Sequence, residues 1–418
     1  MSTMTLSAPA GIRTNRGFWG LLWALYTTQF IGAAFLSTGL VGILRDGGTD
    51  LGTLGALQLL ALVWPVKFLW APLIDRWAPG RARGHYRSWL LVLQPLMVLA
   101  LLAMAVFADP QDGLRVLVIL AAAFVLFSAT QDIAADALSV RGLDRSQHDL
   151  GAGVQVGASY IGTVIGGGLA LLIYDAWGWR AAVIALALCT AAAMVPVLRH
   201  REPERAASNA QPRGLSGMFG MLAVPGAKAW ALGGVPLVTF GSAAVWSLVT
   251  PALVDAGWSL AFIGAVTSMI AAAPALAAAL LGGRLCRRRG RGVTLLLGAG
   301  IQLLGGVCLA PVVWPGAGVD QWLQVPLGVV GACGVLAGYT VMNTGIYAVN
   351  LDLARPGCAG ADFTLLSSIG MLGGSVGAWA ALFLAGMAGY GASLVFGLAV
   401  SVAGVIVCRS HPLLARRP

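Results

Sequence analysis

Three charged side chains lie inside long apolar segments of this chain: Lys67, Asp132 and Asp136. Nearly all the other charged residues lie between such segments or at their ends. A charge at the centre of a bilayer costs about 2.5–3.5 kcal/mol on insertion scales, so ionisable residues at that depth face a cavity or a partner and usually have a function. These three residues therefore constrain both the fold and the mechanism.

The composition is that of a membrane protein. Of 418 residues, 58% are hydrophobic and 10% are charged, with a mean hydropathy of +0.83, whereas soluble chains carry about 25% charge. The 57 glycines suit closely packed transmembrane helices. The net charge of +10 is not a nucleic-acid signal, because the basic residues form short clusters between apolar runs.

The apolar runs predict an all-α protein of twelve transmembrane helices in two six-helix bundles, since a span needs about 20 residues. We expect an N-terminal tail over 1–16, a first bundle over 17–198, a linker over 199–227, a second bundle over 228–408 and a C-terminal tail over 409–418. With both termini in the cytoplasm, 22 of the 26 Lys and Arg residues lie on the cytoplasmic side. The opposite side holds Arg45, Arg115 and Arg180, as the positive-inside rule requires.

The two halves repeat. The pattern Asp-x-Gly-x-x-Leu-x-x-x-Gly-Ala occurs at 46–56 and again at 255–265, an offset of 209 residues. Both copies fall in the first outer loop of their half. Parallel repeats of six spans are the construction principle of the major facilitator fold.

Depth along the helices places the charges together. Lys67 lies nine residues before Arg76, and Asp132 lies nine residues before Arg141. Because helices rise about 1.5 Å per residue, Lys67 and Asp132 should lie at similar depth and form an ion pair. Asp136 lies one turn nearer the cytoplasm on the same helix face. Protonation of an aspartate would release the lysine, which is a usable step in proton coupling. A purely structural ion pair between the two helices is the alternative.

Polar and aromatic residues inside the spans are candidates for the substrate path, although each taken alone also suits helix packing or an interfacial belt. They are Tyr26, Gln29, Gln131, Gln155, Tyr160, Trp246, Tyr339, Asn343 and Tyr347.

Two motifs carry a family resemblance. The segment 67–76, Lys-Phe-Leu-Trp-Ala-Pro-Leu-Ile-Asp-Arg, and the segment 129–138, Ala-Thr-Gln-Asp-Ile-Ala-Ala-Asp-Ala-Leu, resemble signatures of the muropeptide permease and acetyl-CoA transporter branch of the major facilitator superfamily. The resemblance implies that Asp75 and Arg76 belong to a cytoplasmic gate. In the second half Cys286 takes the place of the aspartate, which leaves a matching gate there in doubt.

Length and general character favour the compact members of this branch, which resemble permeases for siderophores of the pyochelin and rhizobactin kind. That resemblance implies proton-driven import of a ferric chelate across the bacterial inner membrane. The alternatives are a muropeptide or cell-wall fragment permease and a drug or metabolite exporter. We expect no enzymatic activity, because no histidine lies at depth and the two aspartates stack on one helix. We also expect no cofactor, no metal site and no nucleic-acid partner, and a protein that works as a monomer with protons and a small molecule as partners.

Overall fold

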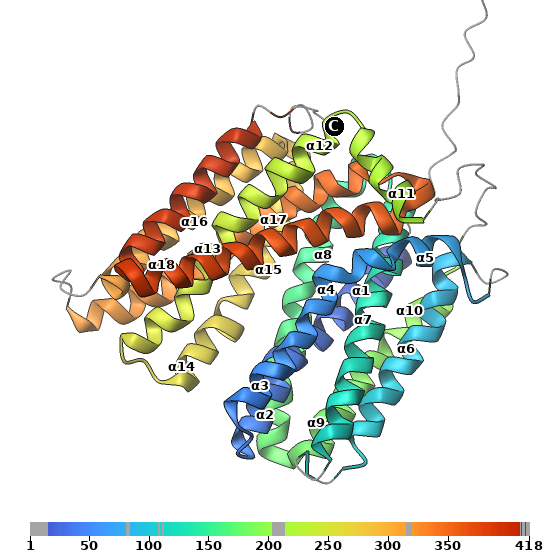
Figure 1. Cartoon of the computed structure of the whole chain (residues 1–418), viewed down its shortest axis with the longest axis horizontal. Coiled ribbons are helices and arrows are strands. Elements are labelled where there is room, and N and C mark those ends of the chain that lie inside the picture. The colour runs from blue at the N-terminus through green and yellow to red at the C-terminus, as the bar shows by residue number, and fades with distance from the viewer. Residues whose placement is uncertain are drawn as a thin grey trace, which may run out of the picture.

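The computed structural model describes residues 16–80, 84–107, 109–110, 113–202, 214–314, 320–409, 411 and 414. Most of the predicted N-terminal and C-terminal tails and part of the predicted linker lie outside these residues. The described chain is helical almost throughout (Figure 1). Ten helical stretches are long and apolar enough to cross a membrane.

Two of the ten stretches each contain two spans. The stretches Arg145–Arg199 and Pro356–Cys408 hold 55 and 53 residues, and about 20 residues suffice to cross the bilayer. Gly178, at φ 80°, and Gly389, at φ 85°, interrupt them with non-helical backbone. Glycine adopts positive φ without the cost of a Cβ, so the chain turns back at these points. The fold therefore has twelve transmembrane helices, as the sequence predicts.

The first half begins at Arg16 and ends at Arg199. Its elements are α1 (Arg16–Ala34), η1 (Phe35–Leu40), α2 (Val41–Asp46), α3 (Leu51–Gln58), η2 (Leu59–Leu62), α4 (Val63–Val66), η3 (Lys67–Leu69), α5 (Ala71–Arg76), α6 (His85–Met104), α7 (Leu114–Gly142), η5 (Arg145–Gln147), α8 (His148–Thr163), η6 (Val164–Leu169), α9 (Ala170–Ala192) and α10 (Met194–Arg199).

The second half follows from Gly214. Its elements are α11 (Gly214–Phe219), η7 (Gly220–Ala223), α12 (Ala227–Ala229), η8 (Trp230–Gly234), α13 (Val235–Asp255), α14 (Leu260–Gly264), η9 (Ala265–Ile270), α15 (Ala272–Arg289), α16 (Arg291–Val313), α17 (Gln321–Leu353), η10 (Pro356–Cys358) and α18 (Ala359–Arg409).

The outer loops repeat in structure as well as in sequence. Tyr174 donates a hydrogen bond to Asp46 at 3.3 Å, and Tyr390 donates one to Asp255 at 2.7 Å. Each bond ties the end of a half's first span to the region where its last two spans meet. The aspartates belong to the repeated segment, so the repeat specifies equivalent contacts in both halves.

The second span is irregular. It passes through α3, η2, α4, η3 and α5, alternating between α and 3₁₀ geometry. Pro65 and Pro72 lie within it, and each removes a backbone donor and crowds the preceding turn. Lys67 begins the 3₁₀ segment η3, so the least regular span carries the buried cation.

The two halves converge at one end and diverge at the other (Figure 1). They meet where α8 packs on α15 and α17, and where α4, η3, α5 and α7 pack on α18. A Cβ on Gly153 would lie 2.9 Å from the backbone oxygen of Ala279, and one on Gly283 would lie 2.6 Å from that of Asp149. Because these two glycines have no side chains, the backbones of α8 and α15 come into direct contact at this end. This is the predicted cytoplasmic end.

Candidate functional site

Lys67 and Asp132 form the predicted ion pair, joining the second span to α7. Both side chains are almost fully buried, at 1% and 3% exposure, and so is Asp136 at 1%. The Oδ2 atom of Asp136 lies 3.9 Å from the ammonium nitrogen of Lys67. The charges therefore lie in the protein interior and not against lipid. Their role in coupling remains a prediction.

The other carboxylate oxygen of Asp136, Oδ1, accepts hydrogen bonds from two neutral donors. Tyr26 of α1 donates its hydroxyl at 3.1 Å, and Gln155 of α8 donates its amide at 2.9 Å. The Oδ2 atom accepts no hydrogen bond within the described structure. Two residues predicted to bind substrate thus hold a predicted coupling residue, and α1, α7 and α8 meet at one carboxylate.

The buried cluster of Lys67, Asp132 and Asp136 holds an uneven number of charged groups. One ammonium and two carboxylates sum to −1 when all three are ionised. A net charge held away from water is costly, and a buried group is often neutralised by taking up or losing a proton. One added proton would make this cluster neutral. The arrangement can therefore bind and release a single proton.

The predicted residues Gln131 and Gln29 are also buried in the first half. Gln131 donates to the backbone oxygen of Leu25 at 3.3 Å and to the Thr28 hydroxyl at 3.1 Å. These bonds join α7 to α1, which is the helix–helix contact expected of a packing residue. Gln131 thus serves helix packing next to Asp132, and Gln29 lies buried in the same interface, where its backbone oxygen accepts a hydrogen bond from Ser128 of α7.

The other five predicted substrate residues are partly exposed: Tyr160, Trp246, Tyr339, Asn343 and Tyr347. Tyr160, Trp246 and Tyr339 pack around one small apolar cluster, although they come from α8, α13 and α17. The Tyr160 hydroxyl also hydrogen-bonds with Thr340 across the halves. Tyr339, Asn343 and Tyr347 follow one another at four-residue intervals, on one face of α17. The structure therefore brings neutral hydroxyl, amide and aromatic groups from both halves together.

The predicted gate residue Asp75 contacts the opposite half. Its two oxygens accept hydrogen bonds from the backbone N–H groups of Gly360 at 3.1 Å and Ala361 at 2.8 Å, in the first turn of α18. Tyr86 adds its hydroxyl at 2.7 Å. The first N–H groups of a helix have no partner within it, and the positive end of the helix dipole favours an anion. We call this arrangement the Asp75 contact.

Burial affects the chemistry of this carboxyl. The pKa of Asp75 is raised to about 6, because loss of water outweighs the hydrogen bonds from Ala361, Tyr86 and Gly360. Arg76, predicted beside it in the gate, is different. Its side chain is exposed, and within the described residues it makes no ion pair.

A second contact between the halves was missed by the sequence analysis. Arg291, at the start of α16, donates to Asp149 of α8 and to Asp352 of α17, each at 2.7 Å. His148 reaches the other Asp352 oxygen at 2.6 Å. We call these four residues the Arg291 cluster. None of these four residues is singled out by the sequence, because the run of basic residues before Arg291 hides its separate role.

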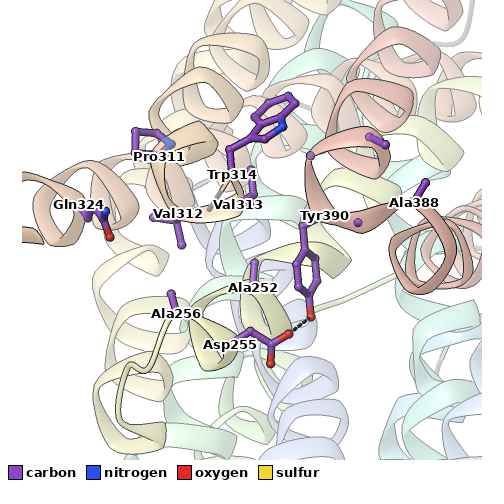
Figure 2. A pocket seen from close by; sticks show the side chains of 13 residues that line it. Ala252, Asp255, Ala256, Pro311, Val312, Val313, Trp314, Gln324, Ala388 and Tyr390 are labelled. Atoms are coloured by element: carbon purple, nitrogen blue, oxygen red, sulfur yellow. Dashed lines mark hydrogen bonds between the residues drawn. The ribbon is translucent and has the colours of Figure 1, made fainter. Parts of the chain in front are cut away.

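The structure also has a cavity of about 520 Å³ within the second half, far along the chain from the charges (Figure 2). It is lined by the ends of α13 and α16, the start of α17 and the Gly389 turn of α18. The Tyr390–Asp255 bond crosses its wall. Since the same bond occurs in the other half, we interpret this region as structural.

The family of the chain follows from these features together with comparison to known proteins. The sequence model of the Major Facilitator Superfamily matches residues 17–378. The chain belongs to this superfamily.

Among its relatives, the anhydromuropeptide permease of Escherichia coli K12 is 29% identical over 380 residues, which are 86% of this chain and 73% of the relative. A putative transporter of Rickettsia felis, AmpG 4, is 31% identical over 165 residues, or 38% of this chain and 40% of the relative. An uncharacterized protein of Haemophilus influenzae is 35% identical over 157 residues, or 37% of this chain and 36% of the relative.

Solved structures agree on the fold. A structure of the E. coli fucose:proton symporter FucP superimposes with a TM-score of 0.68 at 12% identity, covering 94% of this chain and 98% of that chain. The proton:xylose symporter XylE superimposes with a TM-score of 0.63 at 11% identity, covering 94% and 95%. At these identities the likeness concerns the fold alone.

Proposed function

We propose that this protein is a proton-driven inner-membrane permease that imports a cell-wall fragment of the muropeptide class. The buried cluster of Lys67, Asp132 and Asp136 carries the proposal of proton coupling. The cargo is supported by the identity with the anhydromuropeptide permease over 86% of this chain. That relationship favours the muropeptide alternative over the siderophore interpretation, which was based on length and general character.

The proposed cycle uses the net negative charge of the ionised cluster. With Asp136 ionised, the cluster holds one excess negative charge in a dry environment, and a proton arriving from the periplasm neutralises it. Tyr26 and Gln155 bind the oxygen that carries no lysine contact, so they sense its protonation. Because Gln155 belongs to α8, a change at Asp136 alters a contact of a helix that packs on α15 and α17 of the opposite half.

The proposed cargo path lies beside this cluster. The Tyr347 hydroxyl lies near Asn343 and interacts electrostatically with Tyr339 and Asp136. Sugars and peptides present hydroxyl, amide and carboxylate groups together with apolar faces, and a site of neutral hydrogen-bonding groups and aromatic rings suits them. We propose that Tyr160, Trp246, Tyr339 and Asn343 contact cargo, with Tyr347 linking it to the proton site.

We propose inward transport, and the arrangement of the two halves suits this direction. The halves touch at the predicted cytoplasmic end and diverge at the other (Figure 1), so we propose that this conformation loads cargo from the periplasm. A proton moving inward gains about 2.3 kcal/mol per 100 mV of membrane potential, which can drive accumulation.

Uptake in proteoliposomes tests the function. We expect an imposed inward proton gradient to drive accumulation of a radiolabelled muropeptide and not of a radiolabelled ferric pyochelin. Asp136→Asn should abolish gradient-driven uptake but preserve exchange of labelled for unlabelled cargo, because its neutral side chain mimics the protonated carboxyl. Asp50→Asn, which changes an exposed outer carboxylate, is the control. Equal gradient-driven uptake by Asp136→Asn and the unmodified protein would refute the coupling role, and accumulation of the ferric chelate alone would refute the cargo.

A further inference from the structure

The last turns of α15 carry an unusual concentration of positive charge. Arg284, Arg287, Arg288 and Arg289 are all exposed. None of them makes an ion pair or a hydrogen bond within the part of the chain that the structure describes. By contrast, Arg291 and Arg355 at the same end of the molecule are each paired with carboxylates.

The position of these arginines on the helix is informative. Ala277, Leu281, Arg284 and Arg288 are exposed at intervals of three or four residues, so they lie on one face of α15. Leu281 is 59% exposed. The opposite face, which includes Ala279, Gly283 and Cys286, is buried. An apolar stripe that faces the surrounding lipid therefore runs directly into arginine side chains.

This concentration is electrostatically unfavourable without an anion. Arg284 and Arg288 are four residues apart and Arg287 is three from Arg284, and like charges at these spacings repel by about 0.2–0.5 kcal/mol per pair. The positive-inside rule calls for basic residues on this side of the membrane, but it does not require them to share one lipid-facing stripe. Long arginine side chains can keep their heads at the interface while their stems cover apolar surface.

We propose that Arg284, Arg287 and Arg288 bind the phosphate headgroup of an anionic phospholipid of the adjacent leaflet, with its acyl chain along Leu281 and Ala277. Arginine suits this ligand because its planar guanidinium donates two hydrogen bonds to one phosphate. The lipid is favoured over a free phosphate because the apolar stripe continues from the arginines toward the membrane centre. The site is independent of the cargo and of proton coupling.

The site lies next to a contact between the halves. α15 ends at Arg289, Gly290 follows with φ +89°, and Arg291 begins α16. Gly283, one residue from Arg284, packs against the backbone of Asp149. A lipid bound at the end of α15 would therefore hold the helix that carries this contact.

Lipid retention measured by native mass spectrometry tests the site on the full-length protein in detergent. The probes are phosphatidylglycerol and phosphatidylcholine with matched acyl chains. We expect the protein to prefer phosphatidylglycerol, and the double variant R284Q/R288Q to lose this preference about thirtyfold. Each basic residue near an anionic surface contributes about 1 kcal/mol, and about 1.4 kcal/mol corresponds to tenfold in affinity. The double variant R284K/R288K, which keeps both charges, should retain most of the preference.

The matched control is R76Q/R145Q, which removes two exposed arginines from the same end of the first half. It should leave the preference unchanged. An equal loss in this control would show diffuse attraction and refute a site, as would an unchanged preference in R284Q/R288Q. Inorganic phosphate at millimolar concentration should not displace the lipid, and full displacement would assign the site to a free anion. Unaltered phosphatidylcholine retention by R284Q/R288Q would show that this variant is folded.

Discussion

The Asp75 contact and the Arg291 cluster join the halves at equivalent places but use different chemistry. In the Asp75 contact, a carboxylate at the end of the second span accepts hydrogen bonds from backbone N–H groups of α18. In the Arg291 cluster, the start of α8 is held by ion pairs between side chains. The Asp75 contact uses backbone N–H groups at the start of a helix. The Arg291 cluster uses three charged side chains and a histidine.

Cys286 explains the difference. It lies at the end of the eighth span, where Asp75 lies at the end of the second, and it is buried. A thiol is a weak acceptor and cannot replace a carboxylate at a helix N-terminus. Asp149 instead brings the carboxylate on α8 itself, and Arg291 reaches it from the other half. A matching contact, which the sequence left in doubt, is therefore present with its charges rearranged.

The largest expected effect is at Arg291. Arg291→Met would leave the carboxylates of Asp149 and Asp352 without their cation, and removal of one partner from a buried ion pair costs about 3–5 kcal/mol. We expect amide hydrogen exchange in residues 143–153 to accelerate about a hundredfold or more. The double variant Arg291→Met with Asp149→Asn should recover part of this loss, and additive losses in the two single variants would show that the residues do not interact.

Loss of the Asp75 carboxylate should have a smaller effect confined to α18. Asp75→Asn retains the shape but replaces one of the two acceptor oxygens with an NH2 group, which leaves one of the two N–H groups without an acceptor, and loss of a capping side chain costs about 0.5–2 kcal/mol. We expect exchange of the Gly360 and Ala361 amides to accelerate about tenfold. The amides of residues 143–153 should be unchanged, and a similar acceleration there would mean that the two contacts open as one unit.

Gly360 tests the Asp75 contact from the other side. A Cβ at this position would lie 2.7 Å from Asp75 Oδ1 and 3.0 Å from Ile133 Cγ2. Gly360→Ala should therefore displace the carboxylate and accelerate Ala361 exchange to about the extent seen in Asp75→Asn. Gly292→Ala is the matched control, because a Cβ there meets nothing closer than 3.9 Å. Normal Ala361 protection in Gly360→Ala would show that the helix end is not held by Asp75.

The pH dependence separates the contacts further. The pKa of Asp75 is about 6 when buried, against an ordinary 3.8, with burial and Asp362 raising it. The closed contact therefore binds a proton more tightly than the open one, so its stabilisation is complete below about pH 4 and is lost as the pH rises through about 6. We expect the closed population to fall up to severalfold between pH 5 and pH 7, after correction for the intrinsic exchange rate. Asp75→Asn should abolish this dependence, and its persistence would assign it to another group.

Much of the buried charge cluster was predictable from the sequence because burial of charge in a membrane is so costly. Opposite charges at the same depth in a membrane are expected to pair, because pairing lowers the cost of burying them. The structure joins Lys67 and Asp132 in this way. The sequence did not separate Tyr26 and Gln155, which support the charges, from Tyr160, Trp246 and Asn343, which are partly exposed. All are polar or aromatic residues in apolar spans, and only the rotation of each helix distinguishes them.

The sequence by itself determined the twelve spans, the repeat and the pairing of the buried charges, because hydropathy, a constant offset and electrostatic cost are properties of residue order along a helix. The tertiary structure alone decided which helix ends meet. The Arg291 cluster joins positions 142 residues apart, and Asp75 acts on backbone amides 285 and 286 residues away. Such contacts depend on how the two bundles pack against each other, and the local pattern of residues does not specify this packing.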